Sequence, residues 1–272
     1  TGLLFDSDLT FRTTASTISG GADSLGITVN GKTSLFTTLT VSGKLTTNTM
    51  ETNGSGAVGT LEVVQGGYVH FLEQIQLTNY SLGNSHFNLN ISGGTVVSDK
   101  NLTMSNDGYS IITLTAGELT VNGLKVGRNR MLTGNMDNGG KSNVVNLGDS
   151  ENGWAGSGVL TIGEGGLYGI EAGFKKGDID FAASAVNLGQ GTVKASADWE
   201  TASSSQVSGS GNVTLHMMST AGTTFDTNGY TITLNHGLDG AGKLIKTGGG
   251  TLVLNNLAAH EGGTLLILSM GR

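Results

Sequence analysis

The sequence contains no cysteine and no proline, and few of its residues are charged. Without cysteine, disulfide bonds and thiolate metal sites are excluded. Without proline, and with 46 glycines that follow no three-residue period, collagen and polyproline helices are excluded. Charged residues make up only 13% of the chain. Thr, Ser, Asn and Gly are plentiful instead, and they favour turns and β-strand edges over helices.

The charge balance is acidic, with 21 Asp and Glu against 14 Lys and Arg. A nucleic-acid-binding protein needs a basic face, so we expect no nucleic-acid partner. Anionic membrane surfaces are disfavoured for the same reason. Because the sequence has no run of about 18 apolar residues, we also expect no membrane insertion of this segment.

Glycine-containing turns recur at nearly regular intervals, with successive gaps of 24, 27, 23, 23, 26 and 25 residues between Gly43, Gly67, Gly94, Gly117, Gly140, Gly166 and Gly191. Segments such as 39–43, 61–64 and 119–123 alternate apolar and polar residues, which predicts half-buried strands. A period near 25 suits one coil of a β-solenoid and is shorter than helical repeats of about 34–45 residues. We therefore predict an all-β fold with almost no helix: a single right-handed parallel β-solenoid, or β-helix, of about ten coils.

Three stretches interrupt the strand pattern: residues 127–143, 149–158 and 171–180. They are rich in glycine and charged residues, and we interpret them as loop insertions in a solenoid body that covers residues 1–221. Residues 222–272 are predicted to continue the same solenoid as a C-terminal repeat.

The most regular part of this repeat is residues 240–254, where two strand-like pieces flank the triplet Gly248-Gly249-Gly250. Glycine accepts the positive φ values that a tight corner needs. Because side chains alternate along a strand, Leu252 and Leu254 are expected to face one side and Val253 the other. Such a small β unit cannot bury its apolar face alone, so neighbouring coils must share it.

This stretch resembles the autotransporter-associated β-strand repeat, also called the passenger-associated transport repeat, of bacterial surface proteins. The matching positions are Gly240, Gly242, Leu244, Lys246, Gly248, Gly250, Leu252 and Leu254. The likeness covers residues 222–268, and His260 stands where the family usually has tyrosine. The resemblance implies a secreted, surface-associated β-solenoid. It implies no catalytic residues and no cofactor, because the repeat is structural.

The candidates for catalysis are sparse. Asp178 and Asp180 would share one face of a strand, as a general acid and base or a calcium site would require; the simpler interpretation is a solvated strand face. No two of the five histidines lie within four residues of each other, so the sequence contains no local zinc motif.

The candidates for ligand binding are Trp154, Arg128 and Arg130, which lie in two of the polar, glycine-rich stretches. Trp154 either folds back over the side of the rod, which we favour, or stacks on a sugar ring. Arg128 and Arg130 belong to the same hypothesis of a loop-borne binding site.

The sparse catalytic candidates favour a non-enzymatic structural protein, and the resemblance implies that it is an extracellular, passenger-like rod or fibre segment at the bacterial surface. The alternatives are a glycan-binding adhesin and a polysaccharide lyase or hydrolase on the same β-helix fold. A cleft lined by several acids would favour the enzyme, and an aromatic-lined groove the adhesin. The apolar segments near both ends lack a polar cap, so we predict end-to-end stacking into a homo-oligomer or filament.

Overall fold

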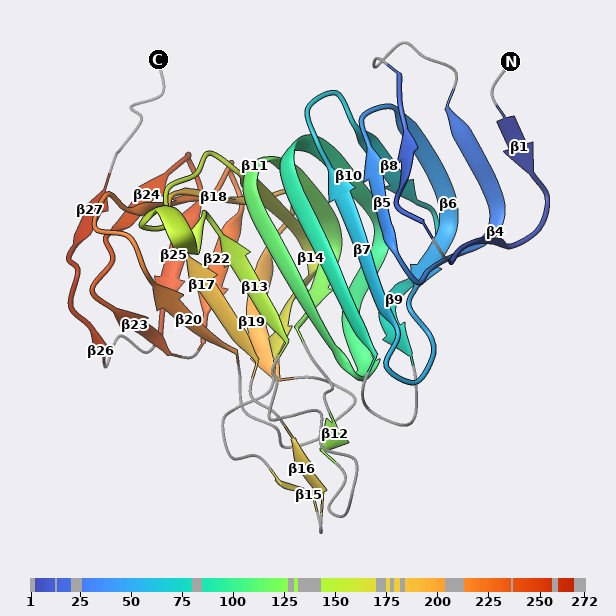
Figure 1. Ribbon diagram of the computed structural model, residues 1–272. Coiled ribbons are helices and arrows are strands. Elements are labelled where there is room, and N and C mark those ends of the chain that lie inside the picture. The colour runs from blue at the N-terminus through green and yellow to red at the C-terminus, as the bar shows by residue number, and fades with distance from the viewer. Residues whose placement is uncertain are drawn as a thin grey trace.

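The strands that the alternating pattern predicts stack into three parallel columns, which form the three faces of a β-solenoid (Figure 1). The computed structural model describes residues 3–12, 14–20, 26–79, 85–126, 130–131, 143–169, 175–176, 179–181, 184–203, 213–235, 237–255 and 259–266. Within these residues the only helical element is the three-residue 3₁₀ turn η1 (Ser150–Asn152). The prediction of an all-β parallel solenoid is confirmed.

Each coil passes through faces that we call A, B and C in that order. Face A stacks β3 (Ser16–Ile18), β5 (Thr38–Val41), β7 (Val58–Val63), the first parts of β10 (His86–Asp107) and β11 (Tyr109–Lys125), β13 (Val144–Leu147), β17 (Ala185–Leu188), β20 (Thr214–Met217), β23 (Leu238–Gly240) and β26 (Ala259–His260). These described rungs agree with the prediction of about ten coils.

Face B stacks β1 (Leu3–Phe5), the first parts of β4 (Ile27–Leu35) and β6 (Lys44–Glu51), β8 (Tyr68–Phe71), the middle parts of β10 and β11, the first part of β14 (Val159–Gly169), β18 (Gly191–Ala195), β21 (Thr223–Asp226), β24 (Leu244–Thr247) and β27 (Thr264–Leu266). Face C stacks β2 (Leu9–Phe11), the last parts of β4 and β6, β9 (Ile75–Asn79), the last parts of β10, β11 and β14, β19 (Trp199–Ser203), β22 (Thr231–Leu234) and β25 (Thr251–Leu254).

The core is one continuous apolar column inside these three faces. Along β10, for example, Phe87, Leu89 and Ile91 point inward and are buried, and the residues between them are half-buried. The same alternation runs from Ile18 to Leu244. Because each strand buries only one side chain in two, a coil depends on its neighbours for both its backbone hydrogen bonds and its apolar contacts.

Coil length varies much more than the glycine spacing suggests. Leu215 pairs with Leu238, 23 residues further on, whereas Ile112 pairs with Val145 and Val145 with Val186, at separations of 33 and 41 residues. The extra residues leave the solenoid between faces C and A. Their described parts are β12 (Arg130–Met131), β15 (Lys175–Lys176) and β16 (Ile179–Phe181), which form a small antiparallel sheet below the body in Figure 1.

The repeat near the C-terminus continues the same columns. The two predicted strand pieces are β24 and β25, and Gly248 has a φ of 79° in the corner between them. Leu252 and Leu254 pack against the core, as the alternation predicts.

Lys246 points into the solenoid on β24 and is only 7% exposed. Its Nζ donates hydrogen bonds to the Thr227 hydroxyl at 2.9 Å, to the Thr247 carbonyl at 3.1 Å and to the Gly248 carbonyl at 2.6 Å. The buried ammonium therefore holds the corner between β24 and β25 together. Lys246, which the sequence analysis identified only as a position that matches the repeat, is thus an internal structural residue.

We expect Lys246→Met to lower the free energy of unfolding of the C-terminal coils by about 2–3 kcal/mol, because one buried and two part-buried acceptors lose a charged donor. Lys243→Met is the matched control, since Lys243 is half-buried and none of its described contacts involves Nζ. Urea denaturation followed by circular dichroism measures both. Equal effects of the two substitutions would contradict a stabilising role for the hydrogen bonds of Lys246.

Candidate functional site

Trp154 lies in a corner between faces A and B, and backbone hydrogen bonds hold it against the solenoid. Its N–H donates to the Asp149 carbonyl at 2.7 Å, and its carbonyl accepts from the Gln190 N–H at 2.7 Å. It has a φ of 64°, a conformation that is uncommon for a bulky residue. The next coil approaches closely at this point: a Cβ added to Gly189 would lie only 2.8 Å from the Trp154 Cβ. Trp154 is accordingly half-buried.

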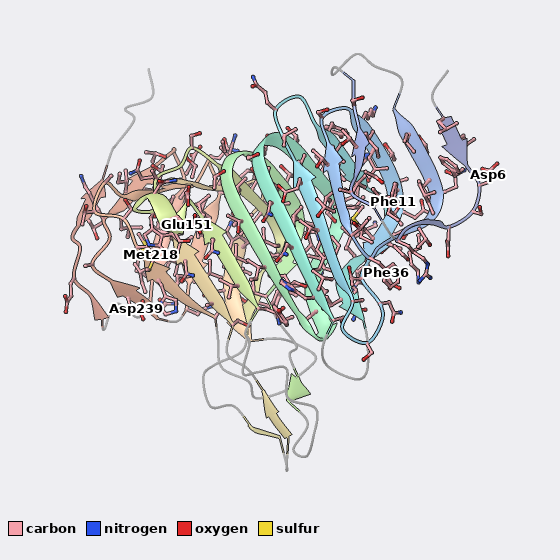
Figure 2. The ribbon with its side chains drawn as sticks, in the orientation of Figure 1. Asp6, Phe11, Phe36, Glu151, Met218 and Asp239 are labelled. Atoms are coloured by element: carbon pink, nitrogen blue, oxygen red, sulfur yellow. The ribbon has the colours of Figure 1, made fainter. Side chains whose placement is uncertain are left out.

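The three sequence-predicted binding residues do not form one described site. Arg128 lies outside the described residues. Arg130 is in β12, opposite Phe181 in the small antiparallel sheet. Figure 2 shows Glu151, three residues before Trp154, on the upper part of the body, whereas β12 projects below it. Trp154 and Arg130 thus lie at different corners of the solenoid.

The acidic and histidine candidates are also dispersed. Asp178 lies outside the described residues, and the Asp180 backbone pairs with Lys175 in the small sheet. Two histidines each contact a neighbouring carboxylate: His70 Nε2 is 2.9 Å from Asp99 Oδ1, and His216 Nδ1 is 2.7 Å from Asp239 Oδ1. In the part of the chain that the structure describes, no group of three or more His, Cys, Asp or Glu residues is arranged to hold a metal ion.

A groove that the sequence analysis missed lies on face C, across β14, β19 and β22. It has a volume of about 440 Å³, and we call it the face C groove. It is lined by Glu164, Gly166, Tyr168, Asp198, Trp199, Glu200, Thr231 and Thr233. The lining comes from three coils, so its members are separated by about one coil length in the chain. The only sequence signal for these residues is the alternation that places most of them on the outward side of each strand, and it does not show that they lie together.

The groove is hollow because a glycine occupies an outward position between larger neighbours. Gly166 has a φ of 69°, and a Cβ there would lie 2.7 Å from the Glu200 carbonyl oxygen of the next coil. No other residue fits this position without strain. Two residues further on, Tyr168 is half-buried, and the Lys125 ammonium lies 5.7 Å from the centre of its ring. This cation–π contact orients the ring at the edge of the groove.

Two of the three carboxylates are held in place by the coil that comes next in the chain. Asp198 Oδ1 accepts a hydrogen bond from the Thr231 N–H at 2.7 Å, and Glu200 Oε2 accepts one from Asn235 Nδ2 at 2.9 Å. Both side chains, and that of Glu164, are exposed to solvent. Each carboxylate accepts more than one hydrogen bond, so fixed acceptors remain available at the mouth of the groove. Trp199, in contrast, points into the core and is 5% exposed.

A second hollow of about 330 Å³ lies on face A, beside the corner that carries η1. Its lining includes Asn90, Thr113, Asp149 and Glu151. Both Asp149 carboxylate oxygens bond within the corner, to the Glu151 N–H and the Asn152 amide. This carboxylate therefore shapes the loop, and the face C groove is the stronger candidate site.

The chain matches no protein-family model, no characterised protein and no solved structure. Within the described residues, no helix has the length and apolar character needed to cross a membrane. The function is therefore inferred from the geometry of the solenoid and of its grooves.

Proposed function

We propose that this chain is a non-enzymatic extracellular structural protein, a passenger-like rod or fibre segment at the bacterial surface. The observation that carries the proposal is the parallel pairing that links successive coils on three faces throughout the described residues. Stability in such a stack is collective, because each coil contacts only its neighbours. The resemblance of residues 222–268 to the passenger repeat supports a secreted, surface location.

The proposal includes head-to-tail association of identical chains. In the described residues the strands of the first coil, β1, β2 and β3, each pair with only one strand, in β4 or β5. A strand that pairs on one side only leaves the N–H and C=O groups of its other edge available to a further strand. Leu3 and Leu4 on β1 are 57% and 56% exposed. An apolar strand edge is a template for further strand pairing, and a contact between unlike ends of identical chains builds an open filament.

The double substitution Leu3→Lys and Leu4→Lys is expected to abolish self-association, because charged side chains on an edge strand block pairing. Multi-angle light scattering and negative-stain electron microscopy should show oligomers for the native chain and monomers for the variant. Val58→Lys is the control, since Val58 is 48% exposed but lies on an inner coil. Native chains that stay monomeric at high concentration would overturn this part of the proposal.

Glycan binding is a second candidate function, favoured by the face C groove. It combines an aromatic ring with fixed carboxylates and threonine hydroxyls, which are common partners of sugar hydroxyls. A lyase acting on acidic polysaccharides is disfavoured here, because none of the described residues that line the groove is basic. We therefore propose an adhesin-type site on a structural rod, and we expect no cleavage of acidic or neutral polysaccharides.

A further inference from the structure

We propose that the face C groove binds a saccharide segment that carries free amines and no acidic groups. This inference rests on the second candidate function, glycan binding, and is independent of filament formation. It names the chemical class of the ligand from the shape of the groove, its hydrogen-bonding groups and its charge.

The shape fits a short carbohydrate. A volume of about 440 Å³ is within the range of about 300–1,000 Å³ for small-molecule sites. The groove crosses the strands β14, β19 and β22, and neighbouring strands lie about 4.8 Å apart. Its span of roughly 10 Å suits two or three linked sugar rings laid across the coils. The floor at Gly166 lets a ring approach the backbone closely, because no side chain projects there.

The hydrogen-bonding groups select a ligand that donates. Glu164, Asp198 and Glu200 are acceptors when ionised, and the hydroxyls of Tyr168, Thr231 and Thr233 are donors and acceptors. Sugar hydroxyls and ammonium groups both donate. A carboxylate–ammonium pair adds charge–charge attraction to the hydrogen bond, whereas an acetamide N–H offers the hydrogen bond alone, which favours an amine over an acetamide at the same ring position.

The negative charge of the groove disfavours acidic saccharides. Among the described lining residues there are three carboxylates and no lysine, arginine or histidine, and the nearby Lys125 ammonium lies over the Tyr168 ring. Uronic acids and phosphorylated sugars would therefore meet repulsion that nothing in the lining offsets. A multidentate metal ion is not the preferred occupant either, because the described acids are not arranged around a common point.

Isothermal titration calorimetry on the full chain with three tetrasaccharides tests the assignment. The probes are a glucosamine tetramer, its N-acetylated counterpart and tetragalacturonate. We expect the glucosamine tetramer to bind, the N-acetylated tetramer to bind about tenfold more weakly, and tetragalacturonate not to bind. Glu164→Gln and Glu200→Gln are each expected to weaken glucosamine binding about tenfold, and Tyr168→Ala to weaken both amino-sugar probes about tenfold.

Glu73→Gln is the matched control, because Glu73 is an exposed acid on an inner coil outside the groove. It should leave the affinity unchanged. An equal loss in Glu73→Gln would indicate attraction to the overall negative charge and overturn the site, as would undiminished binding in the groove variants or equal binding of tetragalacturonate. Stronger binding of the N-acetylated probe would overturn the amine assignment. Repeating the titrations on the Leu3→Lys, Leu4→Lys variant separates failure of this site from failure of the filament proposal.

Discussion

Gly250→Ala is expected to lower the free energy of unfolding of the C-terminal coils by about 3 kcal/mol, whereas Gly249→Ala should leave it unchanged or raise it by about 0.5 kcal/mol. A Cβ on Gly250 would overlap the carbonyl oxygen of Tyr230 in the preceding coil. Backbone atoms in a parallel ladder cannot move aside without breaking the pairing of β22 with β25. At Gly249 a Cβ meets nothing within 4 Å, so alanine only restricts the unfolded chain.

Urea denaturation with tryptophan fluorescence measures this difference. Trp199 is buried in β19, which pairs with β22, and β22 pairs with β25 beside the triplet. Its emission therefore reports on the coils that the substitutions touch. Gly248→Ala should behave like Gly250→Ala, because Gly248 has a φ of 79° and a Cβ there would lie 2.5 Å from the Asn228 N atom. Indistinguishable Gly249 and Gly250 variants would refute the corner geometry.

Phe71→Ala is expected to lower the free energy of unfolding by about 3–5 kcal/mol, as is usual when a buried aromatic ring is deleted. Phe71 is fully buried on the inner side of β8. In the ladder of face B it pairs with Thr47 on one side and Ser98 on the other, and both are buried and small. Neither neighbour can expand into the cavity, so little of the lost packing is recovered.

Phe36→Ala is the control for this substitution. Phe36 is half-buried, and its ring lies 4.6 Å from the Arg12 guanidinium. Figure 2 shows it among the N-terminal coils, close to Phe11. We expect a loss of only about 1 kcal/mol, from one cation–π contact and partial burial. Thermal and urea denaturation of both variants measures the difference, and a larger loss for Phe36→Ala would contradict the assigned core.

The local rules of the chain were sufficient to predict the class of fold. Alternating residues such as Leu252, Val253 and Leu254 determine which side of a strand is buried, because side chains alternate wherever a strand forms. The absence of cysteine, the scarcity of charge and the recurring glycine turns exclude disulfide scaffolds and long helices. These properties depend on neighbours in the sequence, so they are readable without a structure.

Contacts between neighbouring coils could be known only from the tertiary structure, because they depend on which residues lie one coil apart. Coil length changes from 23 to 41 residues where segments leave the solenoid, so no fixed period brings Glu164 beside Glu200 or predicts the face C groove. The same stacking buries Trp199, leaves Trp154 half-buried at a corner and turns Lys246 inward. It also decides how the glycines of the Gly248–Gly250 triplet differ, because the preceding coil brings the Asn228 N atom against Gly248 and the Tyr230 carbonyl against Gly250 but leaves Gly249 free.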